Sequence, residues 1–493
     1  MNIKKNLFFF LIVIFSFAVF TQGQDANEHI KRAKDFANQK DYKKSIDEYS
    51  RAIQLEPDNA FTYLLRGAAY FLLGETNEAL ADCTKAIQLK KDYALAYQMR
   101  GSVFSAMVEY DKAVKDYTKS LELNPEAPIC FLLRGGTFLV RKEFDKAISD
   151  FSRAIALKPD YKEAYYFRGG VYQGIKEIDL AIADYTRTLE LDPNYVKAYI
   201  DRGNSLWKKK EFEKAKDDFS KAIELDPSNA TAYYDRGCML SEIKDYHNAI
   251  NDYTKALDLG HKSGYNNRGN AYKKIGDLEK AIADYDAAIR LTPNVPLYYS
   301  NRGNAYKKKG EREKALMDLT KVIELEPKDA DGYFDRGDLY DDMGKYDMAI
   351  SDYSKAISLQ PSEKKHYNYR GITYDNMKEY QKAISDYSKA IALSPTYSSA
   401  FNNRGNAHYH ARQYKEAVSD FLKAVELDPK YAAAYCNMGK VYKDMEEYEK
   451  AIANYDMAIS LAPENAPYYV WRGIALASNR QYEKAFLDIE KAM

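Results

Sequence analysis

Apolar and small residues recur along almost the whole chain at spacings of three and four residues, which is typical of amphipathic helices. In the stretch 330–363, Tyr333, Gly337 and Tyr340 share one helical face. A second set, which includes Ala349, follows at the same spacing and ends before Pro361, where a helix cannot continue. The pattern therefore predicts two helices joined by a turn.

This helix pair is repeated at a fixed interval. A glycine recurs every 34 residues from Gly67 to Gly237, Gly269 follows after 32 residues, and the 34-residue interval then continues to Gly473. Counted from Ala26, twelve units of 34 residues, one of 32 and a last one of 28 fill the chain to residue 493. A fixed period of this length is typical of a repeat architecture in which neighbouring units share a continuous core.

Within the 34-residue frame, each residue type keeps its place. Position 8 is Gly in thirteen units and position 20 is Ala in thirteen, which predicts a close approach of the paired helices. Eleven of the 14 prolines stand at position 32 and end the second helix. Positions 4, 11, 17 and 24 hold 34 of the 45 tyrosines, which we expect to pack mainly between helices.

The 34-residue period, the order aromatic-x-x-x-Gly-x-x-Tyr and the Ala, Tyr or Phe, Ala and Pro that follow resemble the tetratricopeptide repeat (TPR) family over residues 26–493. This resemblance implies an all-α fold, a right-handed superhelical solenoid of about 14 helix-turn-helix repeats. It also implies a scaffold that binds other proteins on its concave face. The expected parts are units 1–7 (26–261) and units 8–14 (262–493). The short unit 230–261, with Gly260 and the following Gly264, is expected to form a bend.

The first residues have the features of a secretory leader. Lys4 and Lys5 precede an apolar run from Leu7 to Phe20, which matches a signal-peptide core and is short for a membrane span. We expect cleavage before Gln24, so that residues 1–23 form a signal peptide and the protein is exported, periplasmic or secreted. If the leader were retained, the protein would be anchored to a membrane at its N-terminus.

Overall charge argues against one class of partner. The chain has 73 Lys and Arg and 73 Asp and Glu, a formal net charge of zero. Nucleic-acid binding depends on a basic surface, so no nucleic acid is expected as a partner.

Partner-specific residues are expected on the first helix of each unit, where positions 2, 5, 6, 9, 12 and 13 share one face. In 60–195 this stripe is apolar, which predicts an exposed groove. A partner could occupy it, or the superhelix or a neighbouring chain could cover it. The residues hypothesised to form this apolar groove are Leu64, Leu65, Leu132, Leu133, Tyr166 and Phe167.

Units 8, 9 and 12 instead carry pairs of asparagines one helical turn apart. An amide both donates and accepts hydrogen bonds, so a row of amides can hold the backbone of an extended peptide whatever its sequence. This resembles the asparagine ladders of superhelical TPR proteins, whereas the carboxylate clamp of chaperone-binding TPR proteins is not present. Lysines beside the amides could hold carboxylates. The hypothesised residues are Asn267, Asn270, Asn301, Asn304, Asn403, Asn406, Lys273, Lys274, Lys307 and Lys308.

Unit 10 reverses the charge of this stripe. Its five aspartates would repel one another unless a cation or a basic segment of a partner lay there, and the basic segment is the preferred hypothesis because the loop spacing of an EF-hand is absent. The hypothesised peptide-binding residues therefore include Asp335 and Asp338, which share the stripe with Asp331, Asp341 and Asp342.

One charge pattern is expected to be structural. An Arg at position 7 and an Asp at position 23, as in Arg66 and Asp82, recur in twelve units. A contact specific to one partner would not require the same charges in twelve units, so these residues are interpreted as ion pairs between helices. Which Asp meets which Arg stays open.

No catalytic residue, metal ligand or cofactor site is predicted. The four cysteines lie in distant units, and His408 and His410 point to different helix faces. We expect a non-enzymatic protein–protein interaction scaffold. The alternatives are an envelope protein that binds polysaccharide or assists polymer secretion, and a membrane-tethered assembly factor. Phe486 and Ile489 in the last unit are expected to be poorly covered, so that either this end frays or another subunit covers it in a homo-oligomer through the C-terminal unit.

Overall fold

The computed structural model describes residues 24–493, in which 28 helices are joined by short turns and no strand occurs. The helices form fourteen successive pairs, which confirms the predicted all-α repeat fold. The expected signal peptide, residues 1–23, lies outside the described residues. Contacts group the chain into two compact units, which divide between His261 and Lys262 at the end of the 32-residue repeat. Each unit is described by itself.

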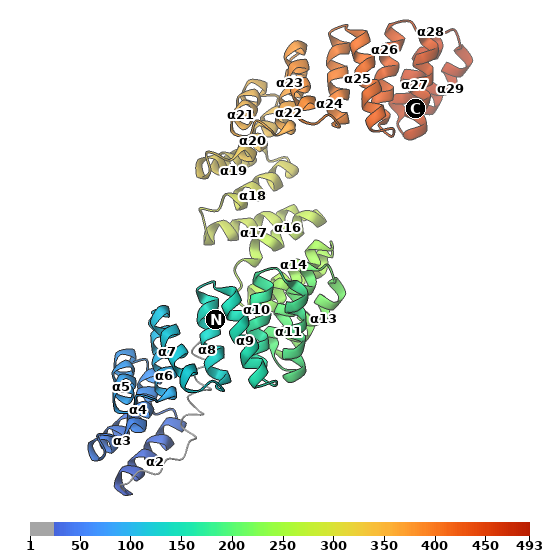
Figure 1. Ribbon diagram of the computed structural model, residues 1–493. Helices are drawn as coiled ribbons and strands as arrows, with labels where there is room; N and C mark the ends of the chain where they lie inside the picture. The colour runs from blue at the N-terminus through green and yellow to red at the C-terminus, as the bar shows by residue number, and fades with distance from the viewer. Residues whose placement is uncertain (1–23) are drawn as a thin grey trace. The chain divides into compact units, whose positions relative to one another are not determined.

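The first unit contains seven helix pairs, in each of which the even-numbered helix comes first along the chain (Figure 1). Its helices are α2 (Gln24–Asn38), α3 (Tyr42–Leu55), α4 (Ala60–Leu73), α5 (Thr76–Leu89), α6 (Ala94–Ala106), α7 (Tyr110–Leu123), α8 (Pro128–Val140), α9 (Phe144–Leu157), α10 (Lys162–Gly174), α11 (Ile178–Leu191), α12 (Val196–Lys208), α13 (Phe212–Leu225), α14 (Ala230–Glu242) and α15 (Tyr246–Asp258).

The second unit contains the other seven pairs in the same alternation. Its helices are α16 (Gly264–Ile275), α17 (Leu278–Leu291), α18 (Pro296–Lys309), α19 (Arg312–Leu325), α20 (Ala330–Asp342), α21 (Tyr346–Leu359), α22 (Lys364–Asn376), α23 (Tyr380–Leu393), α24 (Ser398–His410), α25 (Tyr414–Leu427), α26 (Ala432–Asp444), α27 (Tyr448–Leu461), α28 (Ala466–Ser478) and α29 (Tyr482–Ala492).

The turn inside each pair depends on one residue with a left-handed backbone. In the second pair this residue is Gly74 (φ 97°), and in the fourth it is Lys142 (φ 63°). A left-handed residue after a helix lets the last carbonyls accept hydrogen bonds and turns the chain back. In the 32-residue repeat, Gly260 has a φ of 90°. The second helix of this repeat, α15, has 13 residues, and the first helix of the next repeat, α16, has 12. The two-residue deletion therefore shortens the helices on either side of Gly260.

The glycine at frame position 8 allows the two helices of a pair to approach closely. A Cβ added at Gly371 would lie 2.7 Å from the ring of Tyr387 at frame position 24 of the same pair. Real carbon atoms do not approach that closely without a shift of the neighbour, so this spacing excludes any side chain. The prediction that small residues permit a close approach is confirmed.

First helices of successive repeats also contact one another within each unit. In the first unit α10 contacts α12 and α12 contacts α14, and in the second unit α22 contacts α24. The first helices therefore lie side by side and form a continuous surface, while the second helices pack behind them.

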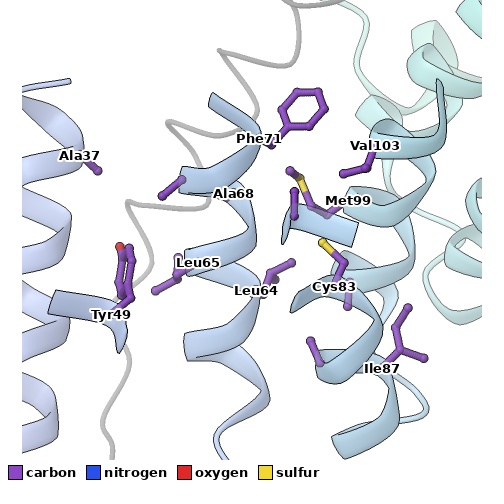
Figure 2. Packing of buried hydrophobic residues seen from close by; sticks show 14 of the residues in the cluster. Ala37, Tyr49, Leu64, Leu65, Ala68, Phe71, Cys83, Ile87, Met99 and Val103 are labelled. Carbon is purple, nitrogen blue, oxygen red and sulfur yellow. The ribbon is translucent and has the colours of Figure 1, made fainter. Parts of the chain in front are cut away.

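The core follows the helix pairs and has no single centre, as is typical of repeat proteins. In the pairs near the N-terminal end, Tyr49, Leu64, Leu65 and Met99 are fully buried in one hydrophobic cluster (Figure 2). Among residues 24–493 no helix is both long enough and apolar enough to cross a membrane.

Candidate functional site

The repeated Arg and Asp form an ion pair inside twelve of the fourteen helix pairs. Arg202 Nη2 lies 2.7 Å from Asp218 Oδ1, and Arg202 Nε donates a second hydrogen bond to the other carboxylate oxygen at 2.8 Å. The two partners are 16 residues apart, one on the first helix and one on the second helix of the same repeat. Twelve such pairs occur in residues 24–493, which confirms the structural interpretation and shows which Asp meets which Arg.

The same arginine also joins neighbouring repeats. Arg202 Nη1 donates a hydrogen bond of 3.1 Å to Thr186 Oγ1 on the second helix of the preceding repeat. Its guanidinium lies 5.7 Å from the ring centre of Tyr199. In the second repeat, the guanidinium of Arg66 lies near two rings, 5.6 Å from the ring centre of Tyr63 and 5.8 Å from that of Tyr70. The arginine thus fastens three helices together and accounts for many of the tyrosines at positions 4 and 11. These charges belong to the scaffold.

The predicted asparagines form hydrogen bonds within and between repeats. Asn301 Nδ2 on α18 donates a hydrogen bond of 3.0 Å to Asn266 Oδ1 on α16, and Asn301 Oδ1 accepts one of 3.3 Å from Lys273. On α16, Asn270 Oδ1 accepts a hydrogen bond of 2.8 Å from the hydroxyl of Tyr285. Asn267 lies beside Asn266, whose Nδ2 donates to Asn267 Oδ1 at 3.3 Å.

A second group of amides shows the same arrangement. Asn403 Nδ2 on α24 donates to Asn368 Oδ1 on α22 at 3.2 Å, and Asn437 Nδ2 on α26 donates to Asn402 Oδ1 on α24 at 3.1 Å. Asn406, which is partly buried, lies one turn after Asn402. The sequence pattern missed Asn266, Asn368, Asn402 and Asn437. A separation of 35 residues between amides was the available signal.

The four predicted lysines differ in their surroundings. Lys307 Nζ lies 2.5 Å from Asp338 Oδ2 and 2.8 Å from Asp342 Oδ2, so it already holds carboxylates of its own chain. Lys274 and Lys308 are exposed. Burial, together with the neighbouring charges of Lys308 and Lys274, lowers the pKa of Lys273.

The acidic stripe of α20 is largely neutralised by adjacent helices. Besides the two aspartates bound to Lys307, Asp331 forms an ion pair of 2.8 Å with Lys365. Asp341 accepts a hydrogen bond of 2.6 Å from Thr373. Asp335 forms no ion pair within residues 24–493, and burial followed by the charge of Asp331 raises the pKa of Asp335 to about 6.

The leucines of the predicted apolar groove are not exposed. Leu64 and Leu65 are 0 % exposed, Leu132 is 3 % exposed and Leu133 is 7 % exposed, so the expectation that they form an open surface is wrong. Leu64 lies in a hydrophobic cluster that includes Met99 and Val103 of the next first helix, α6, and Leu132 lies in another that includes Val171 of the next first helix, α10. Leu65 and Leu133 belong to the same hydrophobic cluster as Leu64.

The two aromatic residues of that predicted groove are partly buried. Phe167 stacks on Phe151 with ring centres 6.0 Å apart. Tyr166 on α10 donates a hydrogen bond of 2.7 Å from its hydroxyl to Asp201 Oδ2 on α12. This contact lies at the edge of a pocket that the sequence pattern did not indicate.

The pocket opens on the surface of the first helices α10, α12 and α14 and has a volume of about 640 Å³. Gly170 and Gly174 occupy stripe positions 9 and 13 of α10, where other repeats carry side chains such as Asn204 and Lys208. A Cβ added at Gly174 would meet nothing within 4 Å, so the missing side chains leave open space. The pocket is lined by Gly170, Gln173, Gly174, Asp201, Asn204, Trp207, Lys208, Lys210 and Glu242.

The remaining sequence candidates are placed as follows. Within residues 24–493, Cys83, Cys130, Cys238 and Cys436 form no disulfide, and no group of three or more His, Cys, Asp and Glu could hold a metal ion. On α29, Phe486 is 62 % exposed and Ile489 is 46 % exposed.

Comparison with solved structures shows similarity to repeat proteins. The chain is 16% identical to a chain of the APC/C hetero-tetramer Cut9–Hcn1, covering 100% of this chain and 96% of that one with a TM-score of 0.41. It is 18% identical to yeast Tom70 over 93% of this chain and 96% of that one, with a TM-score of 0.41. It is 26% identical to YrrB, a TPR protein with an unusual peptide-binding site, over 36% of this chain and 92% of that one, with a TM-score of 0.33.

A search of curated protein sequences gave no significant match. Family models gave matches along almost the entire described chain. Models described as tetratricopeptide repeat match residues 60–93, 196–229, 330–363, 365–397 and 432–465, and also 99–162, 141–196, 219–251 and 398–427. A model described as TPR repeat matches 33–74, 269–310, 303–344 and 413–446. The repeat length, the helix pairs and these matches together show that the chain belongs to the tetratricopeptide repeat family.

Proposed function

We propose that the protein is an exported, non-enzymatic scaffold that binds a protein or an extended peptide along the surface of its first helices. The observation that carries this proposal is the row of amides that link successive first helices, such as Asn301 to Asn266 and Asn403 to Asn368. An amide can donate two hydrogen bonds and accept two. The bond between helices fixes the orientation of each amide and leaves further donors and acceptors for a peptide backbone.

Orientation before binding increases affinity, because the side-chain entropy has already been lost on folding. A backbone-directed ladder suits a scaffold that must hold an extended segment without selecting many of its side chains. The exposed Lys274 and Lys308 beside the ladder add positive charge for acidic residues of such a segment. Lys307 does not contribute to that charge, because Asp338 and Asp342 already hold it.

The experiment is an affinity capture with residues 24–493 as bait, with Asn267, Asn270, Asn301 and Asn304 all changed to Ala in a parallel bait. The control bait carries Asn248→Ala and Asn454→Ala, which lie on second helices. Capture of one protein by wild type and control, and its loss from a quadruple variant with wild-type circular dichroism, would support the proposal. Equal capture by all three baits would exclude the amides of α16 and α18 as the site.

Export rests on the leader-like residues 1–23. Sequencing of the mature N-terminus tests it, and a chain that begins at Gln24 is expected. An intact N-terminus in the membrane fraction would favour the alternative of a membrane-tethered assembly factor.

One arrangement favours a polysaccharide as the alternative ligand. Tyr409 on α24 donates a hydrogen bond of 2.7 Å to Asp444 on α26, as Tyr166 does to Asp201. A ring held by a carboxylate is a suitable face for a sugar. Binding of the protein to envelope polysaccharide that is lost in Tyr166→Ala and Tyr409→Ala would support this function.

The exposed Phe486 face of α29 also supports self-association, which analytical ultracentrifugation of Phe486→Ser against wild type would test.

A further inference from the structure

The pocket on α10, α12 and α14 contains a carboxylate without a counter-ion. Asp201 is partly buried and lines the pocket, yet it forms no ion pair with any residue in 24–493. Its carboxylate accepts a hydrogen bond of 2.7 Å from the neutral hydroxyl of Tyr166. Burial raises the pKa of Asp201, and the nearby charge of Asp235 raises it further.

A second carboxylate lies close enough to the first for its charge to raise the pKa of Asp201. Asp235 on α14 accepts a hydrogen bond of 2.9 Å from Asn204 Nδ2, also a neutral donor, and burial raises the pKa of Asp235. Within residues 24–493 neither acid forms an ion pair. Lys197 acts on Asp201 through space and lowers the pKa of Asp201, and His261 does the same to Asp235. Negative charge is therefore concentrated around Asp201, which lines the pocket.

An aromatic ring is held rigidly at the same pocket. Trp207 Nε1 donates a hydrogen bond of 2.7 Å to Glu242 Oε2, and Lys210 Nζ lies 2.9 Å from Glu242 Oε1. These contacts fix the edge of the indole and neutralise both Lys210 and Glu242. Lys208, the other basic residue of the lining, is exposed, so solvent screens its charge.

A planar cation fits this combination of groups. A guanidinium can stack on an indole face and bind a carboxylate through two parallel hydrogen bonds, and it gives up water more readily than an ammonium group. A neutral sugar could stack on Trp207, but it would leave the charge of Asp201 buried and uncompensated. The missing side chains at Gly170 and Gly174 provide the room for a long side chain to enter.

We propose that this pocket binds the guanidinium of an arginine side chain in an extended peptide, with Asp201 as its counter-ion and Trp207 as its stacking surface. The proposal rests on the proposed function, in which the first helices hold an extended segment. It adds a side-chain preference to that function: the first unit selects an arginine, and the amide ladder of the second unit holds backbone.

The two tryptophans of the chain, Trp207 and Trp471, provide a direct test. Trp471 also lies on a first helix, but Lys440 and Lys443 lie over its ring, so it is a natural control with the opposite charge. Residues 24–493 labelled with fluorotryptophan give one ¹⁹F signal for each, and Trp471→Phe assigns them. The probes are acetyl-Gly-Arg-Gly-amide and its neutral analogue with citrulline.

We expect the arginine peptide to shift the Trp207 signal in a saturable way at concentrations up to about 10 mM, the range of weak single-residue binding. The citrulline peptide should leave it unchanged, and Trp471 should respond to neither. Asp201→Asn should weaken the response roughly tenfold or more, because a charge-assisted pair is lost. Gly174→Ala, which narrows the pocket without changing its charge, should also weaken it.

An equal response to both peptides, or no response to arginine, would overturn the proposal. A response of Trp207 to maltohexaose but not to arginine would overturn it in favour of a sugar site. These results differ from a failure of the proposed function. If the affinity capture finds a partner that depends on the amide ladder while Trp207 ignores arginine, the scaffold function stands and the arginine preference alone fails.

Discussion

Asp201 and Asp218 belong to the same repeat but have opposite surroundings. Asp218 on α13 is 5 % exposed and receives two hydrogen bonds from Arg202, whereas Asp201, the residue before that arginine, faces a pocket and has no cationic partner. The first arrangement is repeated twelve times in the described chain. The difference separates the charges that build the solenoid from those available to a ligand.

The physical reason is the cost of burying charge. A carboxylate removed from water is destabilising unless a cation or several donors replace its hydration. Arg202 supplies that replacement for Asp218, so the pair stabilises the contact between two helices. Asp201 lacks it, and a partially dehydrated carboxylate without a counter-ion is a place where a cationic ligand gains more than it would in water.

The largest effect is expected where an ion pair of the scaffold is broken. Asp218→Asn leaves the Arg202 guanidinium without its counter-charge, and we expect the free energy of unfolding of the first unit to fall by about 2–3 kcal/mol. Urea unfolding followed by circular dichroism measures this. A change below about 0.5 kcal/mol, typical of a surface substitution, would contradict the structural role of the pairs.

Next come two glycine substitutions that should act in opposite directions. In Gly371→Ala the new Cβ would lie 2.7 Å from the Tyr387 ring, so we expect a loss of about 1–3 kcal/mol. In Gly174→Ala the Cβ meets nothing within 4 Å, and the better helix propensity should add up to about 1 kcal/mol. Thermal unfolding of both variants compares them, and a gain at Gly371 or a loss at Gly174 would contradict the packing described.

A smaller effect, dependent on pH, is expected at Asp335. Its pKa is about 6 in the folded chain against an ordinary value of 3.8, so the folded state favours the protonated form. The contribution of this group to stability is complete below pH 4 and is lost as pH rises through about 6. The groups that act on Asp335 are the charges of Asp331, Lys365 and Asp338 and a hydrogen bond with Asn304.

Asp335→Asn should therefore be more stable than wild type by roughly 1 kcal/mol at pH 7, after discounting for partial exposure, and equal to it near pH 4. Unfolding temperatures measured from pH 4 to pH 8 test this. The control is Asp331→Asn, where the carboxylate is largely exposed and paired with Lys365, and which should show no gain at pH 7. A constant difference at every pH would point to packing and not to charge.

Much of this fold could be predicted from the sequence because the constraints repeat. Gly at position 8 and Ala at position 20 each indicate a close approach of helices, and Pro at position 32 indicates a helix end. Because these residues recur along the chain, the helix pairs are unambiguous. The ion pairs were predictable for the same reason: a pair of charges that recurs in twelve of the fourteen units serves the scaffold. Their exact partners needed the structure, because Arg202 could have met an aspartate of either neighbouring repeat.

The candidate site was less predictable because it depends on distances between repeats. Helical periodicity placed Leu64 on the stripe but not its distance from the next first helix, which buries it. It identified Asn301 but not Asn266, 35 residues earlier, to which Asn301 donates. The pocket depends on absent side chains at Gly170 and Gly174, and a pattern of present residues does not indicate empty space.

The most direct test of the separation between scaffold charges and ligand charges compares two variants, Asp201→Asn and Asp218→Asn. For each variant, the unfolding temperature and the binding of the arginine peptide at Trp207 are measured. We predict that Asp201→Asn raises the unfolding temperature at pH 7 and loses arginine binding. Asp218→Asn should lower the unfolding temperature and keep binding at a temperature where the chain is folded. If both variants lose stability and binding together, Asp201 is a structural carboxylate like Asp218, and the account is contradicted.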